Sequence, residues 1–224
     1  MLNELTKTIL LLVTGLFPII NPPASGFITL TMVPHASPAE RGELALRIAI
    51  NSLFILLGSL SVGAYVLSFF GISMPVLRVA GGLVVAVAGW NLLQAPAEDD
   101  TGSDAQQETG VVHAASLRAK AFYPLTLPIT VGPGSIAVAI ALGTGSPRAG
   151  LSPVHVVGVA IALLILCASI YVCVRFAGHL EKLLGAVGMQ VVMRLLAFVL
   201  FCIGVQIVWL GVAELLESLQ LHAK

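Results

Sequence analysis

The chain has 224 residues, of which 58% are hydrophobic and only 10% charged, and its eleven Lys and Arg residues balance its eleven Asp and Glu residues. A soluble domain is about 45–50% apolar and roughly 25% charged, so this chain lacks the polar surface that a soluble fold needs. The neutral net charge excludes a protein that binds nucleic acid through a basic face, and the hydrophobicity excludes a disordered chain. A mean hydropathy of +1.01 predicts a protein of the lipid bilayer.

The N-terminus and the cysteines give no sign of secretion or metal binding. Residues 8–17 form an apolar run after Lys7, but no small-residue cleavage site follows, so we expect a retained first helix. Cys167, Cys173 and Cys202 lie in apolar runs without paired spacing, which is typical of small buried hydrophobic residues.

Six apolar runs have about the 20 residues that a membrane-spanning helix needs. In chain order they cover residues 5–33, 44–70, 75–93, 119–142, 154–176 and 191–216. The one strongly polar stretch, residues 95–116, carries five acidic residues and separates the third run from the fourth. Its composition predicts a solvated loop. We therefore expect an all-α polytopic membrane protein with membrane units at 1–94 and 117–224 on either side of this loop.

Helix-breaking residues interrupt the first and fourth runs in corresponding places. A shift of 106 positions aligns Phe17 with Tyr123, Pro18 with Pro124, Pro22 with Pro128 and Gly26 with Gly132. Because each unit has about three spans, an odd number, the second unit must be inverted relative to the first. The pattern predicts two inverted-topology repeats with broken or re-entrant helices in spans 1 and 4, an arrangement typical of secondary transporters.

The basic residues favour one orientation. In a six-crossing topology, one side holds Arg41, Arg47, Arg118, Lys120, Arg175, Lys182 and Arg194, and the other holds Lys7, Arg78, Arg148 and Lys224. Lys and Arg concentrate on the cytoplasmic side of membrane proteins. We therefore expect both termini to lie outside the cytoplasm.

The breaks are the predicted substrate site. Each proline frees a carbonyl at membrane depth, and such backbone persists only where it is buried in protein or lines a wet cavity. A new half-helix is expected from about Ala24, and another from Gly134 or Ser135, with N-terminal amides that suit a carboxylate. The predicted substrate-binding residues are Asn21, Pro22, Ser25, Gly26, Thr126, Thr130, Gly132, Pro133, Gly134 and Ser135. The alternative is a pair of kinked helices whose freed groups are satisfied by neighbouring Ser and Thr.

Other chemistry is not indicated. The sequence Gly132-Pro133-Gly134-Ser135 has no following Lys and no preceding strand, so a nucleotide loop is not expected. We expect no enzyme, no metal site and no cofactor, because no nucleophile–base pair or ligand cluster is visible. All acidic residues lie in loops or near span ends, so a coupling ion, sodium or proton, would have to use backbone carbonyls and hydroxyls. Transport without a coupling ion is equally compatible with the sequence.

Three blocks carry a family resemblance. The pair Asn21-Pro22 followed by Thr29-Leu30-Thr31, residues 70–82, and residues 128–134 resemble the signature blocks of the MarC family of integral membrane proteins. The resemblance covers nearly the whole chain and implies a multi-pass protein of the cell (inner) membrane. It carries Asn21, Pro22, Thr130, Gly132, Pro133 and Gly134 over as the substrate region. The chain departs from the family pattern at Pro23-Ala24, which bears on the shape of the pocket.

Similar members of the family, of the SnatA type, are classed as transporters of small neutral amino acids such as glycine and alanine. The resemblance thus implies a secondary transporter, which could act as an exporter. Its expected partners are a small neutral amino acid as substrate and the lipid bilayer, and no nucleic acid is expected. A homo-oligomer is compatible with the sequence. Two alternatives stay open: a transporter of another small solute or drug, and a non-transporting structural or sensory membrane protein.

Overall fold

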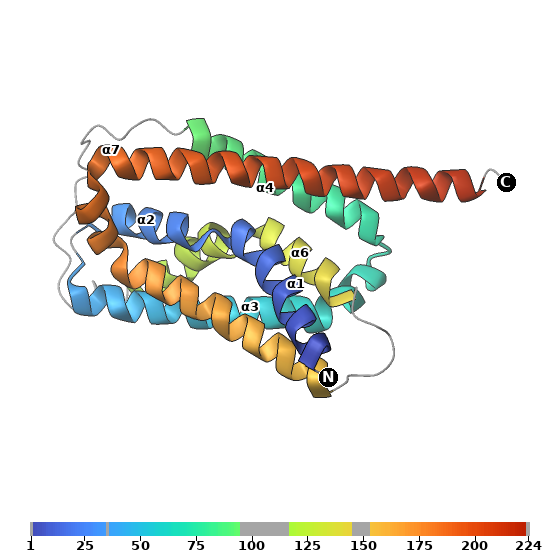
Figure 1. The fold of residues 1–224 in the computed structure, drawn as a ribbon, viewed down its shortest axis with the longest axis horizontal. Coiled ribbons are helices and arrows are strands. Elements are labelled where there is room, and N and C mark those ends of the chain that lie inside the picture. Colours follow the sequence, from blue (N-terminus) through green and yellow to red (C-terminus); the bar gives the residue numbers. More distant parts are fainter. Residues whose placement is uncertain (1, 35, 95–116, 145–152, 223–224) are drawn as a thin grey trace.

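The computed structural model describes residues 2–34, 36–94, 117–144 and 153–222, and this part of the chain is helical without a strand (Figure 1). The predicted polar loop at 95–116, together with Arg148 and Lys224, lies outside the described residues. The helices in chain order are α1 (Leu2–Ile20), α2 (Pro22–Met32), α3 (Pro38–Phe69), α4 (Met74–Gln94), η1 (Ala121–Thr130), α6 (Pro133–Thr144) and α7 (Pro153–His222).

The predicted all-α polytopic class is confirmed for this part of the chain. Five segments are long and apolar enough to cross a membrane: Leu2–Met32, Pro38–Phe69, Met74–Gln94, Pro153–Gly185 and Val187–Ser218. A sixth span results if Leu117–Thr130 and Pro133–Gly143, which are bent by 65°, count as one. Each segment overlaps one predicted run. Two of the predicted spans lie within α7, which changes direction at Gly185, where φ is 69°.

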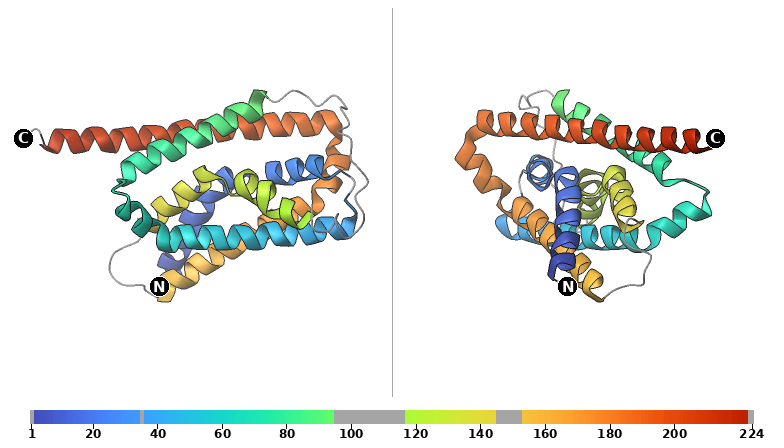
Figure 2. Two further views of the ribbon diagram at one scale, coloured as in Figure 1. Left: turned by 180° about the vertical axis from the view of Figure 1, so that it is seen from behind. Right: turned by 45° about the vertical axis from the view of Figure 1, so that its right-hand side comes forward.

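Each broken span lies along a long helix from the other half of the chain (Figures 1 and 2). On one side, α2 packs so closely on the first half of α7 that a Cβ at Gly26 would lie 2.6 Å from the carbonyl oxygen of Cys173. On the other side, α3 packs on η1 and α6, where a Cβ at Gly63 would lie 2.3 Å from the Ile140 side chain. The long helix that follows each broken span therefore packs on the broken span of the other half of the chain.

The helix α4 and the second half of α7 run side by side in opposite directions (Figure 1). Their backbones approach closely at glycines: a Cβ at Gly89 would lie 2.5 Å from the Phe201 nitrogen, and one at Gly204 would lie 2.3 Å from the Ala86 nitrogen. Small residues are the usual means of helix association in lipid, because lipid tails compete with larger apolar contacts. Arg78 of α4 pairs with Glu214 of α7 across this contact.

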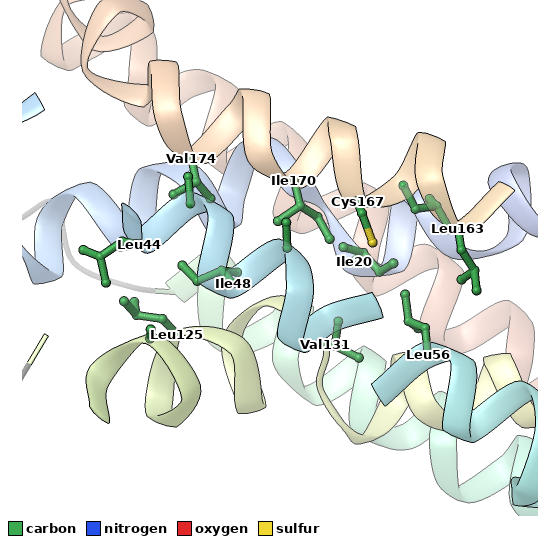
Figure 3. Packing of buried hydrophobic residues seen from close by; sticks show 14 of the residues in the cluster. Ile20, Leu44, Ile48, Leu56, Leu125, Val131, Leu163, Cys167, Ile170 and Val174 are labelled. Carbon is green, nitrogen blue, oxygen red and sulfur yellow. The ribbon is translucent and has the colours of Figure 1, made fainter. Parts of the chain in front are cut away.

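Buried apolar side chains form the largest cluster where the broken spans meet α3 and α7 (Figure 3). The cluster contains Ile48 and Leu56 of α3 and Ile170 of α7. It also contains Ile20, which precedes the first break, and Val131, which lies within the second. Both breaks thus border one buried region in the middle of the bundle.

Candidate functional site at the two helix breaks

The first break lies between α1 and α2 at Asn21. Its backbone is left-handed, with φ 47° and ψ 64°, a conformation that Asn tolerates better than most residues. Its side-chain oxygen accepts a hydrogen bond from the Ala24 amide at 3.4 Å. Because Pro22 and Pro23 have no N–H, the carbonyls of Pro18 and Ile19 lose the donors that a continuous helix would supply. The break therefore presents carbonyl oxygens.

The amides of the first half-helix are already used, contrary to expectation. The helix α2 begins at Pro22, two residues before the predicted start, because proline is well suited to the first helical turn. Its first two residues have no N–H, the Ala24 amide donates to the Asn21 side chain, and the Ser25 amide donates to the Asn21 carbonyl at 3.0 Å. The prediction that this half-helix offers amides to a carboxylate is wrong.

The second break is longer and begins inside η1. Tyr123 and Leu127 have extended backbone there, with φ/ψ of −124°/124° and −118°/116°. Each precedes a proline, which disfavours helical backbone in the residue before it. Leu127 is the residue that the shift of 106 positions aligns with Asn21. Both spans thus leave the regular helix directly before the aligned prolines Pro22 and Pro128.

Three hydroxyls compensate for the breaks by donating five residues back along the chain. Ser25 Oγ donates to the Ile20 carbonyl at 3.1 Å. Thr126 Oγ1 donates to the Ala121 carbonyl at 2.6 Å, and Thr130 Oγ1 donates to the Leu125 carbonyl at 2.7 Å. These three side chains are at most 1% exposed. Their protons are used internally, so towards a solute they offer oxygen lone pairs.

The second half-helix differs because its first amides are free. The helix α6 begins at Pro133, and no hydrogen bond joins the amide of Gly134 or Ser135 to another described residue. Ser135 is only 3% exposed. Gly132 is confined as well, since a Cβ there would lie 2.8 Å from the Pro128 carbonyl oxygen. The donors that could receive a carboxylate are therefore at α6.

Eight of the ten predicted site residues border the breaks, and the other two, Gly26 and Pro133, do not. Those whose side chains or amides border the breaks are Asn21, Pro22, Ser25, Thr126, Thr130, Gly132, Gly134 and Ser135. Gly26 instead allows α2 to pack on α7, and Pro133 is exposed at the start of α6. All of the residues that border the breaks are buried except Gly132, which is half-buried.

Sequence reasoning overlooked two residues of α3 beside the second break. Asn51 donates through Nδ2 to Thr126 Oγ1 at 3.4 Å, and Ser52 is fully buried. Polar residues in the middle of an apolar run were the available signal. Within the described residues, no three His, Cys, Asp or Glu side chains are placed to hold a metal.

Replacement of Asn21 tests the first break. We expect Asn21→Ala to destabilise the protein by about 1–3 kcal/mol, because it removes the cap and leaves a residue with a Cβ in left-handed backbone. Asn21→Gly should lose less stability, because glycine adopts left-handed backbone without strain and only the side-chain cap is removed. Thermal unfolding in detergent measures both. Equal melting temperatures for the two variants would contradict the left-handed conformation.

Comparisons with known proteins agree on one family. The family model described as MarC family integral membrane protein matches residues 6–216. The inner membrane protein MarC of Salmonella typhimurium is 30% identical over 217 residues, which cover 96% of this chain and 98% of the relative. That of Citrobacter koseri is 32% identical over 218 residues with the same coverage, and that of Escherichia coli O1:K1 is 30% identical over 217. No solved structure matches the chain significantly.

Proposed function

This chain belongs to the MarC family and is a multi-pass inner membrane protein, and on that premise we propose that it is a secondary transporter of small neutral amino acids such as glycine and alanine. The proposed site lies between the breaks at Asn21 and at residues 127–132. Its substrate is a zwitterion with a small side chain that needs no charged partner.

The observation that carries this proposal is the division of polar groups between the two breaks. Free amides at Gly134 and Ser135 suit a carboxylate, whereas the carbonyls of Pro18 and Ile19 and the hydroxyl oxygens suit an ammonium group. Irregular backbone with uncompensated groups is costly in hydrocarbon and is retained where it lines a functional cavity. In a kinked pair used only for packing, the free amides at α6 and the carbonyls at the first break would remain an uncompensated cost at membrane depth.

Two inverted-topology repeats are part of the proposal. The aligned breaks before Pro22 and Pro128 support it, as do the reciprocal packing of each broken span on the other half's long helix and the antiparallel contact between α4 and the end of α7. In such an arrangement, exchange between two equivalent packings opens the central site to each side of the membrane in turn.

Flux into proteoliposomes that hold the purified full-length chain tests the function. We expect saturable uptake of labelled glycine and alanine, with mutual competition, and its dependence on imposed sodium or pH gradients identifies any coupling ion. Liposomes without protein are the control. Absence of saturable flux under every gradient, from protein shown to be folded, would contradict the proposal. Flux of other solutes alone would favour the second candidate, a transporter of another small solute.

A further inference from the structure

Ser52 stands apart from the other hydroxyl residues of the bundle. Most Ser and Thr side chains in the described helices donate to a carbonyl three to five residues back along the chain, which satisfies the hydroxyl in an apolar surrounding. They are Thr6, Thr14, Ser25, Thr29, Thr31, Ser59, Ser61, Thr126, Thr130, Ser169 and Ser218. Ser52 is 0% exposed, and its Oγ has no hydrogen-bond partner. An unmade hydrogen bond of this kind is costly, so it calls for an explanation.

The position of Ser52 relates it to both breaks. It lies one helical turn from Ile48 and one from Leu56, on the face of α3 that those residues share. That face packs into the cluster that contains Ile20 and Val131, and Figure 3 shows Val131 beside α3 between Ile48 and Leu56. The preceding residue, Asn51, is bonded to Thr126 of the second broken span. The unpartnered hydroxyl therefore lies on the face of α3 that packs into the cluster bordered by both breaks.

The polar side chains at the two breaks act mostly as acceptors. The hydroxyls of Ser25, Thr126 and Thr130 have given their protons to carbonyls, so only their lone pairs remain. The prolines at the first break leave two further carbonyl oxygens without donors. An oxygen-rich shell without an opposing carboxylate suits a monovalent cation, whose charge several neutral oxygens share.

We propose that Ser52 Oγ is a ligand of the cationic group bound at this site, completing from α3 the oxygen shell that the two breaks supply. The inference rests on the proposed function. Two sources share the chemistry: the ammonium group of the amino acid, and a sodium ion that moves with it. The hydroxyl stays unpartnered without solute because its partner is the solute.

Thermal unfolding of the purified full-length protein, titrated with alanine in sodium chloride or in choline chloride, tests this proposal. For Ser52→Ala we expect a melting temperature without solute at or above that of wild type, because an unpaired buried hydroxyl is removed. The alanine concentration that gives half-maximal stabilisation should rise about tenfold, as the loss of a hydrogen bond to a charged group predicts. Ser59→Ala is the matched control, since Ser59 lies two turns along the same face and already donates to Ile55.

The outcomes separate the two claims. A half-saturating alanine concentration in Ser52→Ala within twofold of wild type would overturn the role of Ser52 and leave the transporter proposal standing. Wild-type protein that alanine stabilises in neither salt would overturn both. A shift in the sodium requirement in the variant identifies sodium as the bound cation, and a shift that is equal in sodium and choline identifies the ammonium group.

Discussion

Gly132→Ala is expected to lower amino acid flux at least about tenfold while the protein remains folded. The added Cβ would lie 2.8 Å from the Pro128 carbonyl oxygen, so the backbone between them must shift. This backbone sets the position of the free amides of Gly134 and Ser135, and a displacement near 1 Å at a binding group is enough for a large loss. Initial rates in proteoliposomes, normalised to the amount of inserted protein, measure the effect.

Gly58→Ala is the control for this substitution. Gly58 is an exposed residue of α3 with no heavy atom within 4 Å of the Cβ position. Alanine there should leave flux unchanged and stabilise the helix by about 0.5–1 kcal/mol. Wild-type flux in folded Gly132→Ala would show that the backbone at the second break does not position the solute.

Gly204→Val is expected to have the largest effect on stability. A Cβ at this residue would lie 2.3 Å from the Ala86 nitrogen and 2.6 Å from the Ala86 Cα, both backbone atoms of α4 that cannot move without displacing the helix. The substitution should separate α4 from the second half of α7 and cost about 3 kcal/mol or more. The melting temperature in detergent and the fraction of monodisperse protein are the measurements.

Val205→Leu provides the comparison at the neighbouring residue. Val205 is 49% exposed, so its side chain points away from α4 and a larger apolar group should be tolerated in lipid or detergent. An unchanged melting temperature in both variants would contradict the close glycine packing. Loss of stability in both would indicate that this helix tolerates no change on either face.

The spans were predictable because their signal is local. An apolar run of sufficient length has few alternatives to a membrane helix, and prolines such as Pro22 and Pro128 interrupt any helix that contains them. For this reason the six runs and the two interruptions correspond to observed segments and breaks. The turn at Gly185 that divides α7 also fell between two predicted spans.

The hydrogen bonds at the breaks were not predictable, because they depend on which groups the folded backbone brings within reach. Asn21 was expected as a ligand, and its side chain caps α2. Thr126 and Thr130 were expected to face a solute with their hydroxyls, and they donate to carbonyls five residues back because the prolines changed the register of the helix. Ser52 is a polar residue within an apolar run, like several other Ser residues, and its lack of a hydrogen-bond partner in the folded chain distinguishes it from them.

Accessibility of a buried residue at the second break tests the central claim most directly. In a chain whose three native cysteines are replaced, we expect Ser135→Cys to react with a small hydrophilic thiol reagent although Ser135 is 3% exposed, because the proposed transport cycle opens this site to water. Alanine should slow the reaction, whereas Ala162→Cys, which replaces a 0% exposed residue of the apolar core, should not react. A Ser135→Cys thiol that stays unreactive, or that reacts at the same rate with and without alanine, would contradict a solute site at the helix breaks.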